Sequence, residues 1–289
     1  MNKLNSHRMG MDRIVFGLII LCAVLALCPL IWLIFDLFLK GYKQIHFDFF
    51  TQVSPTPMEA YLSQAGGQII SGGILNGISG SFLVVVIGAV IAVPLGILAG
   101  VFMYDNHSPR FSNFFHYLIV SMLGIPPVIT GIVVYLWMVE PLHGFSALAG
   151  GISLAIVMLP MIVHSTFNAL ETLPKNIKEE VVVLGGTYTS TIFRIVLPAV
   201  KDKIISGILV AISRAVGITS PLIITALGAP EINWNTGRPV STVSLLIWNF
   251  FNNSGMVDMV WTTALFLFLT VIVLNIIAKV IYHEQRLHT

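Results

Sequence analysis

The sequence carries very little charge. Only 10% of its 289 residues are Asp, Glu, Lys or Arg, whereas a soluble globular domain has about 25%. Hydrophobic residues make up 56% of the chain, and its mean hydropathy is +0.90. This composition excludes a soluble globular protein and indicates an integral membrane protein. The net charge of +2 gives no reason to expect a nucleic-acid partner.

Cysteine is almost absent as well. Cys22 and Cys28 both lie in the first apolar segment, so no disulfide framework is expected. Each follows a leucine, where a lipid-modified cysteine would follow a small residue, and both are interpreted as thiols in lipid. The first apolar run, residues 14–35, is long enough to span a membrane, so we expect no cleavable signal peptide.

The motifs of several enzyme classes are missing. The chain has no G-x-x-x-x-G-K-[ST] phosphate loop, no H-E-x-x-H and no C-x-x-C. Its eight histidines are scattered, and the apolar segments hold neither paired catalytic carboxylates nor the several acids that a proton relay usually needs. We therefore expect no catalytic residue, metal or cofactor in this chain, and the pattern counts against a proton-coupled pump.

Six segments are apolar over the roughly 20 residues that a membrane helix requires. They are residues 14–39, 78–104, 117–139, 147–167, 204–227 and 261–282. The predicted class is therefore an all-α, polytopic membrane protein with about six transmembrane helices. The Gly124–Pro127 run predicts a kink or unwound start in the third segment, and Pro160 predicts a bend near the end of the fourth. Polar residues in the fifth segment predict that it faces protein or water.

Lysine and arginine are distributed unevenly between the loops. With the N-terminus in the cytoplasm, eleven of the 15 Lys and Arg residues fall inside, three fall outside and Arg214 lies within a span. The positive-inside rule therefore places both termini and the loop at 168–203 in the cytoplasm. The predicted organisation is an N-terminal cytoplasmic segment, 1–13, followed by a single transmembrane domain, 14–289. The outer loops, 40–68 and 228–259, are interpreted either as docking surfaces for an external partner or as solvated connectors.

Small residues recur along the second span. The pairs Gly73/Gly77 and Gly96/Gly100 have the small-xxx-small spacing that lets two membrane helices approach closely. This spacing predicts helix–helix contact but does not identify the neighbouring helix.

The loop at 168–203 has the features of a structured element. Pro174 suits the first turn of a short amphipathic helix, and Gly185-Gly186 predicts its end and a sharp turn. Thr187 can cap a second helix, which Pro198 then interrupts. Such a helix–turn–helix could sit in a groove of a soluble subunit. The alternative is an ordinary cytoplasmic loop that contains one amphipathic helix.

The same loop resembles the docking loop of ABC-importer permease subunits. The spacing E-x5-G-x9-I-x-L-P is met by Glu179, Gly185, Ile195, Leu197 and Pro198. Glu180 and Val181 stand where that family has two alanines. The resemblance implies that this segment contacts an ATPase subunit. The implied coupling residues are Glu179, Glu180, Gly185, Ile195, Leu197 and Pro198.

The resemblance is closest to the phosphate-importer permeases of the PstA type, and it covers most of the chain from about residue 14. Matching segments are Gly72-Gly73-Ile74, 93–97, Gly124-Ile125-Pro126, Leu159-Pro160, 169–174 and 213–222. That family typically has an arginine followed by Gly-Glu-Thr-Ala-Pro-Leu. This chain keeps Arg214 and Thr219 but has Ile218 in place of the acid and Ser220 in place of the alanine. His164 stands where the family often has an arginine.

The missing acid leaves Arg214 with several possible roles. An arginine within a span usually has a partner. The acid could come from another subunit, Arg214 could meet an anionic substrate directly, or the substrate could differ from phosphate. A structural arginine that bonds to backbone carbonyls is a further alternative. The resemblance favours a translocation path lined by Arg214, Thr219 and Ser220.

The resemblance implies a permease subunit of a binding-protein-dependent ABC importer that moves inorganic phosphate by ATP-driven alternating access. The implied partners are a second related permease (PstC-like), a dimeric ATPase (PstB-like) that binds the ATP and Mg, an external phosphate-binding protein (PstS-like) and the lipid of a bacterial inner membrane. A permease for another oxyanion or small solute, an ion-gradient-driven secondary transporter and a non-transporting scaffold are the alternatives.

Overall fold

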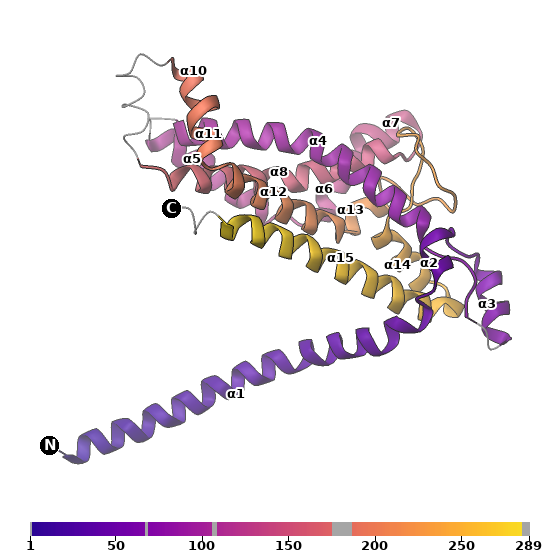
Figure 1. Ribbon diagram of the computed structural model, residues 1–289, viewed down its shortest axis with the longest axis horizontal. Helices are drawn as coiled ribbons and strands as arrows, with labels where there is room; N and C mark the ends of the chain where they lie inside the picture. Colours follow the sequence, from indigo (N-terminus) through magenta and orange to yellow (C-terminus); the bar gives the residue numbers. More distant parts are fainter. Residues whose placement is uncertain (1, 67–68, 106–108, 175–186, 285–289) are drawn as a thin grey trace.

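The computed structural model describes residues 2–66, 69–105, 109–174 and 187–284 (Figure 1). All regular elements of these residues are helices, which confirms the predicted all-α class. The four long helices are α1 (Asn2–Gly41), α4 (Leu75–Asp105), α8 (Ala147–Glu171) and α15 (Val257–Glu284). Each contains a stretch long and apolar enough to cross a membrane. Pro160 is buried within α8, and the helix continues past it to Glu171.

The third predicted span is broken, as its glycine and prolines predict. It consists of α5 (Pro109–Leu123) and α6 (Pro127–Val134). Helix α6 continues through a π-helical turn, η2 (Tyr135–Val139), into α7 (Glu140–Leu142). The two halves are bent by 93° at the break. Proline lacks an amide N–H and disfavours helical backbone in the residue before it, so the Gly124–Pro127 run cannot continue α5.

The fifth predicted span, 204–227, is wrong as a single continuous helix. Helix α12 (Lys201–Val216) has 16 residues, which is a length of about 24 Å, and it ends at Gly217. The short helix α13 (Ser220–Ile223) follows after a break. By length and composition, the described residues contain four candidate spans, or five if the bent pair counts as one span.

Helices α4 and α8 pack closely against each other along their length. A β-carbon at Gly96 would lie 2.6 Å from Cγ2 of Ile162, and one at Gly100 would lie 2.6 Å from Cβ of Thr166. Both distances are shorter than a van der Waals contact, so only glycine allows this approach. The contact predicted from the Gly96/Gly100 spacing is confirmed, and the neighbouring helix is α8.

We expect Gly96→Ala to lower the stability of the bundle by about 1–3 kcal/mol, because the new methyl group would press on the stiff, β-branched Ile162. Thermal unfolding of the purified protein in detergent would measure the loss. Gly17→Ala is the matched control, since a β-carbon at Gly17 meets no atom within 4 Å. Equal midpoints for the two variants would contradict the packing argument.

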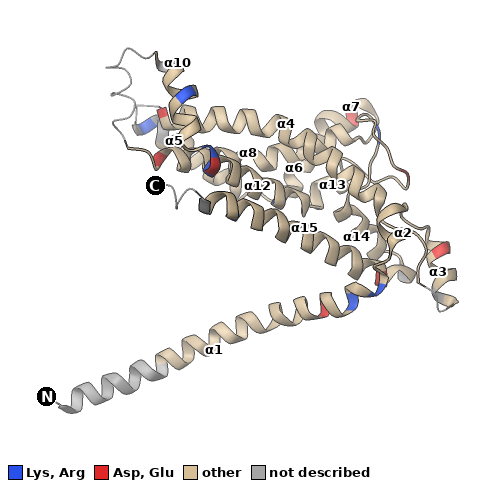
Figure 2. Cartoon of the chain, in the orientation of Figure 1, with Lys and Arg blue, Asp and Glu red and all other residues tan. Residues whose placement is uncertain are grey.

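Charged residues gather near the two ends of the bundle (Figure 2). The start of α1, the end of α15 and helix α10 (Tyr188–Thr191) lie at one end, and α2 (Phe47–Thr51), α3 (Pro57–Ala65) and α7 lie at the other (Figure 1). We call them the terminal end and the loop end. The described parts of the segments predicted to be cytoplasmic therefore share one end, while the side of the membrane that this end faces stays a prediction.

Helix α1 diverges from the bundle and meets α15 only toward the loop end (Figure 1). Nζ of Lys40 lies 3.0 Å from Oδ2 of Asp36 and 4.7 Å from the ring centroid of Trp261, on α15. A β-carbon at Gly41 would lie 2.8 Å from Cβ of Leu265. A cation–π contact and one close approach thus join the two helices, while the ion pair lies within α1.

The loop end contains several short helices, while residues 228–239 form no helix and are mostly exposed. The short helices are η1 (Tyr42–Gln44), α2, α3, α14 (Val243–Phe251) and η4 (Ser254–Met256). Asn76 is 2% exposed, and its Nδ2 donates to Oγ of Ser54 at 2.9 Å and to the carbonyl of Ala229 at 3.0 Å. One buried amide on α4 therefore ties both predicted outer loops together.

Candidate functional site

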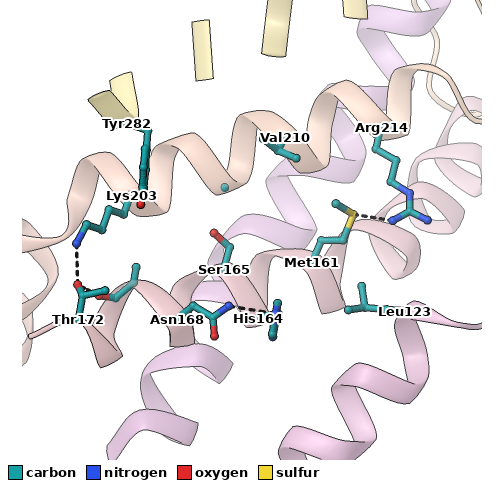
Figure 3. Close-up of a pocket in the computed structure, with 12 residues that line it drawn as sticks. Leu123, Met161, His164, Ser165, Asn168, Thr172, Lys203, Val210, Arg214 and Tyr282 are labelled. Carbon is teal, nitrogen blue, oxygen red and sulfur yellow. Dashed lines mark hydrogen bonds between the residues drawn. The ribbon is translucent and has the colours of Figure 1, made fainter. Parts of the chain in front are cut away.

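A groove with a cavity of about 560 Å³ runs between α8 and α12 (Figure 3). Its lining residues are Leu123, Met161, His164, Ser165, Asn168, Ala169, Thr172, Lys203, Gly207, Val210, Arg214 and Tyr282. Most of them come from the two helices. Leu123, at the end of α5, and Tyr282, near the end of α15, complete the wall.

Two matching stripes of residues form this groove. On α12 the stripe is Lys203, Gly207, Val210 and Arg214, and on α8 it is Met161, Ser165, Asn168 and Thr172. Both follow the spacing i, i+4, i+7, i+11, which places the residues on one face of a helix. The stripes run in opposite directions, so Thr172 lies beside Lys203 and Met161 lies beside Arg214 (Figure 3).

The closest approach of the two stripes is near their middle. A β-carbon at Gly207 would overlap the side chain of Ser165. Glycine at this position therefore lets α12 lie directly on α8. The groove extends from this contact toward Arg214 on one side and toward Lys203 on the other (Figure 3).

Arg214 lies at the end of the groove opposite Lys203, in the last turn of α12, and it is exposed. Within the described residues its one polar contact is from Nη1 to the sulfur of Met161, at 3.7 Å, and no carboxylate there forms a salt bridge with it. Ile218, at the position of the missing acid, packs against the main hydrophobic core. The described part of the chain thus supplies neither the acid nor a carbonyl bond, which leaves the guanidinium available to an anion.

Lys203 lies at the other end of the groove. Its Nζ donates to Oγ1 of Thr172 at 2.8 Å, and that hydroxyl donates to the carbonyl of Ala169 at 2.7 Å. Between the two cations, Nδ2 of Asn168 lies 3.0 Å from Nε2 of His164. The His164 ring stacks near His116 of α5, with ring centroids 5.9 Å apart.

The lining residues of this groove include Arg214, Lys203 and His164 but no Asp or Glu. A cavity lined by charges of one sign between low-dielectric walls concentrates ions of the opposite sign. The residues present offer N–H and O–H donors but no ionised acceptor. The arrangement therefore suits the passage of an oxyanion and disfavours a cation.

Thr219 and Ser220 do not line this cavity. They lie at the break between α12 and α13, where the carbonyl of Thr219 accepts hydrogen bonds from the amides of Leu222 and Ile223. The residue that follows them, Pro221, packs tightly against Gly131 of α6. Their role in a translocation path stays a prediction.

Part of the predicted coupling segment lies outside the described residues, namely Glu179, Glu180 and Gly185. Ile195 belongs to a π-helical turn, η3 (Ile192–Val196), and Leu197 and Pro198 begin α11 (Leu197–Ala199). Thr187 caps the preceding turn as predicted, because its Oγ1 accepts from the amide of Ser190 at 3.4 Å. The helical structure is interrupted at Val200, two residues after Pro198.

The described half of this segment has one buried and one exposed side. Ile192 and Val196 are at most 2% exposed and pack with Leu170, at the end of α8. Phe193 and Ile195 are 55% and 41% exposed. The exposed pair forms an apolar surface at the terminal end. Phe193 lies outside the motif positions that predicted the docking segment, although its alternation with the buried neighbours could have revealed it.

Comparisons with known proteins agree with this arrangement. The family model described as binding-protein-dependent transport system inner membrane component matches residues 92–286. The chain is 31% identical to the phosphate transport system permease protein PstA of Haemophilus influenzae, over 95% of each chain. It is 29% identical to the PstA protein of Yersinia pestis, over 98% of this chain and 94% of that protein. A solved inward-facing structure of the MetNI methionine ABC transporter superposes with a TM-score of 0.58 at 15% identity, over 80% of this chain and 99% of that one, which shows a shared fold.

Proposed function

The chain belongs to the family of binding-protein-dependent transport system inner membrane components, and from this premise we propose that it is the permease subunit of an importer for inorganic phosphate. It is a multi-pass membrane protein and a non-catalytic subunit. Membership of this family implies an ATPase partner and an external binding-protein partner. The ATP and its Mg would be bound by the ATPase, because this chain has no phosphate loop of its own.

The observation that supports phosphate most strongly is Arg214 in a groove without carboxylates. A guanidinium presents a planar fork of N–H donors that matches the oxygens of phosphate. Two relatives that carry the phosphate permease name match nearly the whole chain at about 30% identity. Physical chemistry and similarity therefore point to the same substrate.

The importer would work by alternating access. An external phosphate-binding protein (PstS-like) would deliver the anion at the loop end, whose two loops are joined through Asn76. The path would lie between this chain and a second, PstC-like permease. A dimeric, PstB-like ATPase would bind the segment 179–198 and transmit its closure to α12. Both termini would lie in the cytoplasm of a bacterium, as the positive-inside distribution predicts.

The test is ATP hydrolysis by this chain purified with its co-isolating subunits in lipid. Added binding protein together with inorganic phosphate is expected to raise the rate, whereas sulfate and molybdate should leave it at the basal level. Stimulation by sulfate or molybdate instead would replace phosphate by another oxyanion, the alternative that Ile218 and His164 favour. Transport without any co-isolating ATPase would contradict the importer itself and support a secondary transporter.

A further inference from the structure

The groove contains a second cation that the proposed function does not use. Lys203 and Arg214 line the same cavity from the same face of α12. They are eleven residues apart, which is about 16 Å along the helix axis. Arg214 lies at one end of the groove, and Lys203 lies at the other, beside Thr172 (Figure 3).

The ammonium group of Lys203 has N–H donors that are available to a ligand. It carries three N–H groups, and one of them is bonded to Thr172. Within the described residues no carboxylate forms a salt bridge with it. Asn168, one turn before Thr172 on α8, also lines the cavity and is exposed.

The acids closest in sequence do not line the groove. Glu171 precedes Thr172 and Asp202 precedes Lys203, yet neither contributes to the cavity wall. One residue along a helix is a rotation of about 100°, which turns each acid away from the stripe that its neighbour joins. Both ends of the groove therefore present positive charge.

We propose that Lys203, held in place by Thr172 and assisted by Asn168, forms a second oxyanion site, which receives the anion after Arg214 and from which it leaves the protein. This inference rests on the proposed function. A single guanidinium site that binds phosphate tightly would also release it slowly. Rapid transport requires sites that are strong enough to be entered and weak enough to be left, and several sites in series meet both needs.

The experiment uses the importer assembled with its other subunits in lipid nanodiscs. Cys22 and Cys28 are replaced by alanine, and Val210→Cys places a thiol in the groove between the two cations, where Val210 is 38% exposed. An anionic methanethiosulfonate reagent labels this thiol, and mass spectrometry of this chain follows the rate. The concentration of inorganic phosphate that halves the rate is compared among variants.

Lys203→Gln is expected to raise the half-protecting phosphate concentration about tenfold, because the anion loses one charged hydrogen-bonding partner. Lys203→Arg should restore protection to within about twofold, because it keeps the charge and the donors. Lys201→Gln is the matched control, since Lys201 is exposed on the same turn but does not line the groove. Thr172→Val, which removes the tether but keeps the charge, should have less than about a third of the effect of Lys203→Gln.

The outcomes separate this site from the function on which it rests. If Thr172→Val weakens protection as much as Lys203→Gln, the lysine is a structural tie between α8 and α12, and the second site is overturned. Protection that Lys203→Gln leaves unchanged also overturns it. If phosphate stimulates ATP hydrolysis but never slows labelling, the second site fails while the proposed function stands. If phosphate does neither, the proposed function fails as well.

Discussion

Arg214→Gln is expected to reduce phosphate uptake by at least about 30-fold, which corresponds to the loss of about 2 kcal/mol of anion binding. Glutamine keeps hydrogen-bonding capacity but loses the charge and the fork. Because the one polar contact of Arg214 within the described residues is with Met161 and the residue is exposed, the substitution should leave the bundle intact. Uptake of labelled phosphate into proteoliposomes, driven by internal ATP, measures the effect.

The control for this variant keeps the charge. Arg214→Lys should retain part of the uptake, since an ammonium still attracts the anion but cannot bind two of its oxygens in one plane. Basal ATP hydrolysis and co-isolation of the other subunits should be the same in both variants and in the wild type. Normal uptake by Arg214→Gln would remove the groove from the translocation path.

Ile195→Asp is expected to release the ATPase subunit from the purified complex, with an affinity loss of about 2–4 kcal/mol, or 30-fold to 1,000-fold. Ile195 is 41% exposed beside Phe193, on the side of the segment that faces away from α8. A carboxylate buried there without a partner would have to lose its hydration on docking. Co-purification of the ATPase at increasing dilution gives the change in affinity.

A residue of similar exposure at the loop end provides the control. Ile232 is 39% exposed, so Ile232→Asp makes the same chemical change far from the proposed ATPase contact. It should not alter co-purification. Because Ile195 is exposed in the free chain, the variant should also insert and fold normally. An ATPase that binds both variants equally would contradict the docking role of this segment.

The broken helices show what the amino-acid pattern could predict. The Gly124–Pro127 run predicts the break between α5 and α6 by itself, because proline restricts the local backbone whatever surrounds it. The end of α12 at Gly217 was missed, because a single glycine does not force a helix to stop and hydropathy continues across it. Pro160 does not end α8, since packing against α4 holds the helix together around it, and the bend expected there stays a prediction.

The site was predicted at one end and missed at the other. Arg214 stands out in the sequence because a charge within an apolar span is costly. Asn168, Thr172 and Lys203 were assigned to the cytoplasmic loop at 168–203, where polar residues are unremarkable. Helix α8 runs to Glu171 and α12 begins at Lys201, so two of these residues lie on helices and Thr172 lies at a helix end. Hydropathy finds where the apolar stretch ends, which here is not where the helices end.

The contact between Gly207 and Ser165 has a mechanical consequence. Helix α12 is a single straight segment whose helical structure is interrupted at each end, at Val200 and at Gly217. Its contact with α8 lies between the two cations, so a tilt of α12 about this contact would move its two ends in opposite directions. A tilt that widens the groove at Arg214 narrows it at Lys203, and the reverse tilt exchanges the two. A tilt of α12, driven by the segment that ends at Val200, would thus keep the groove from being wide at both cations at the same time.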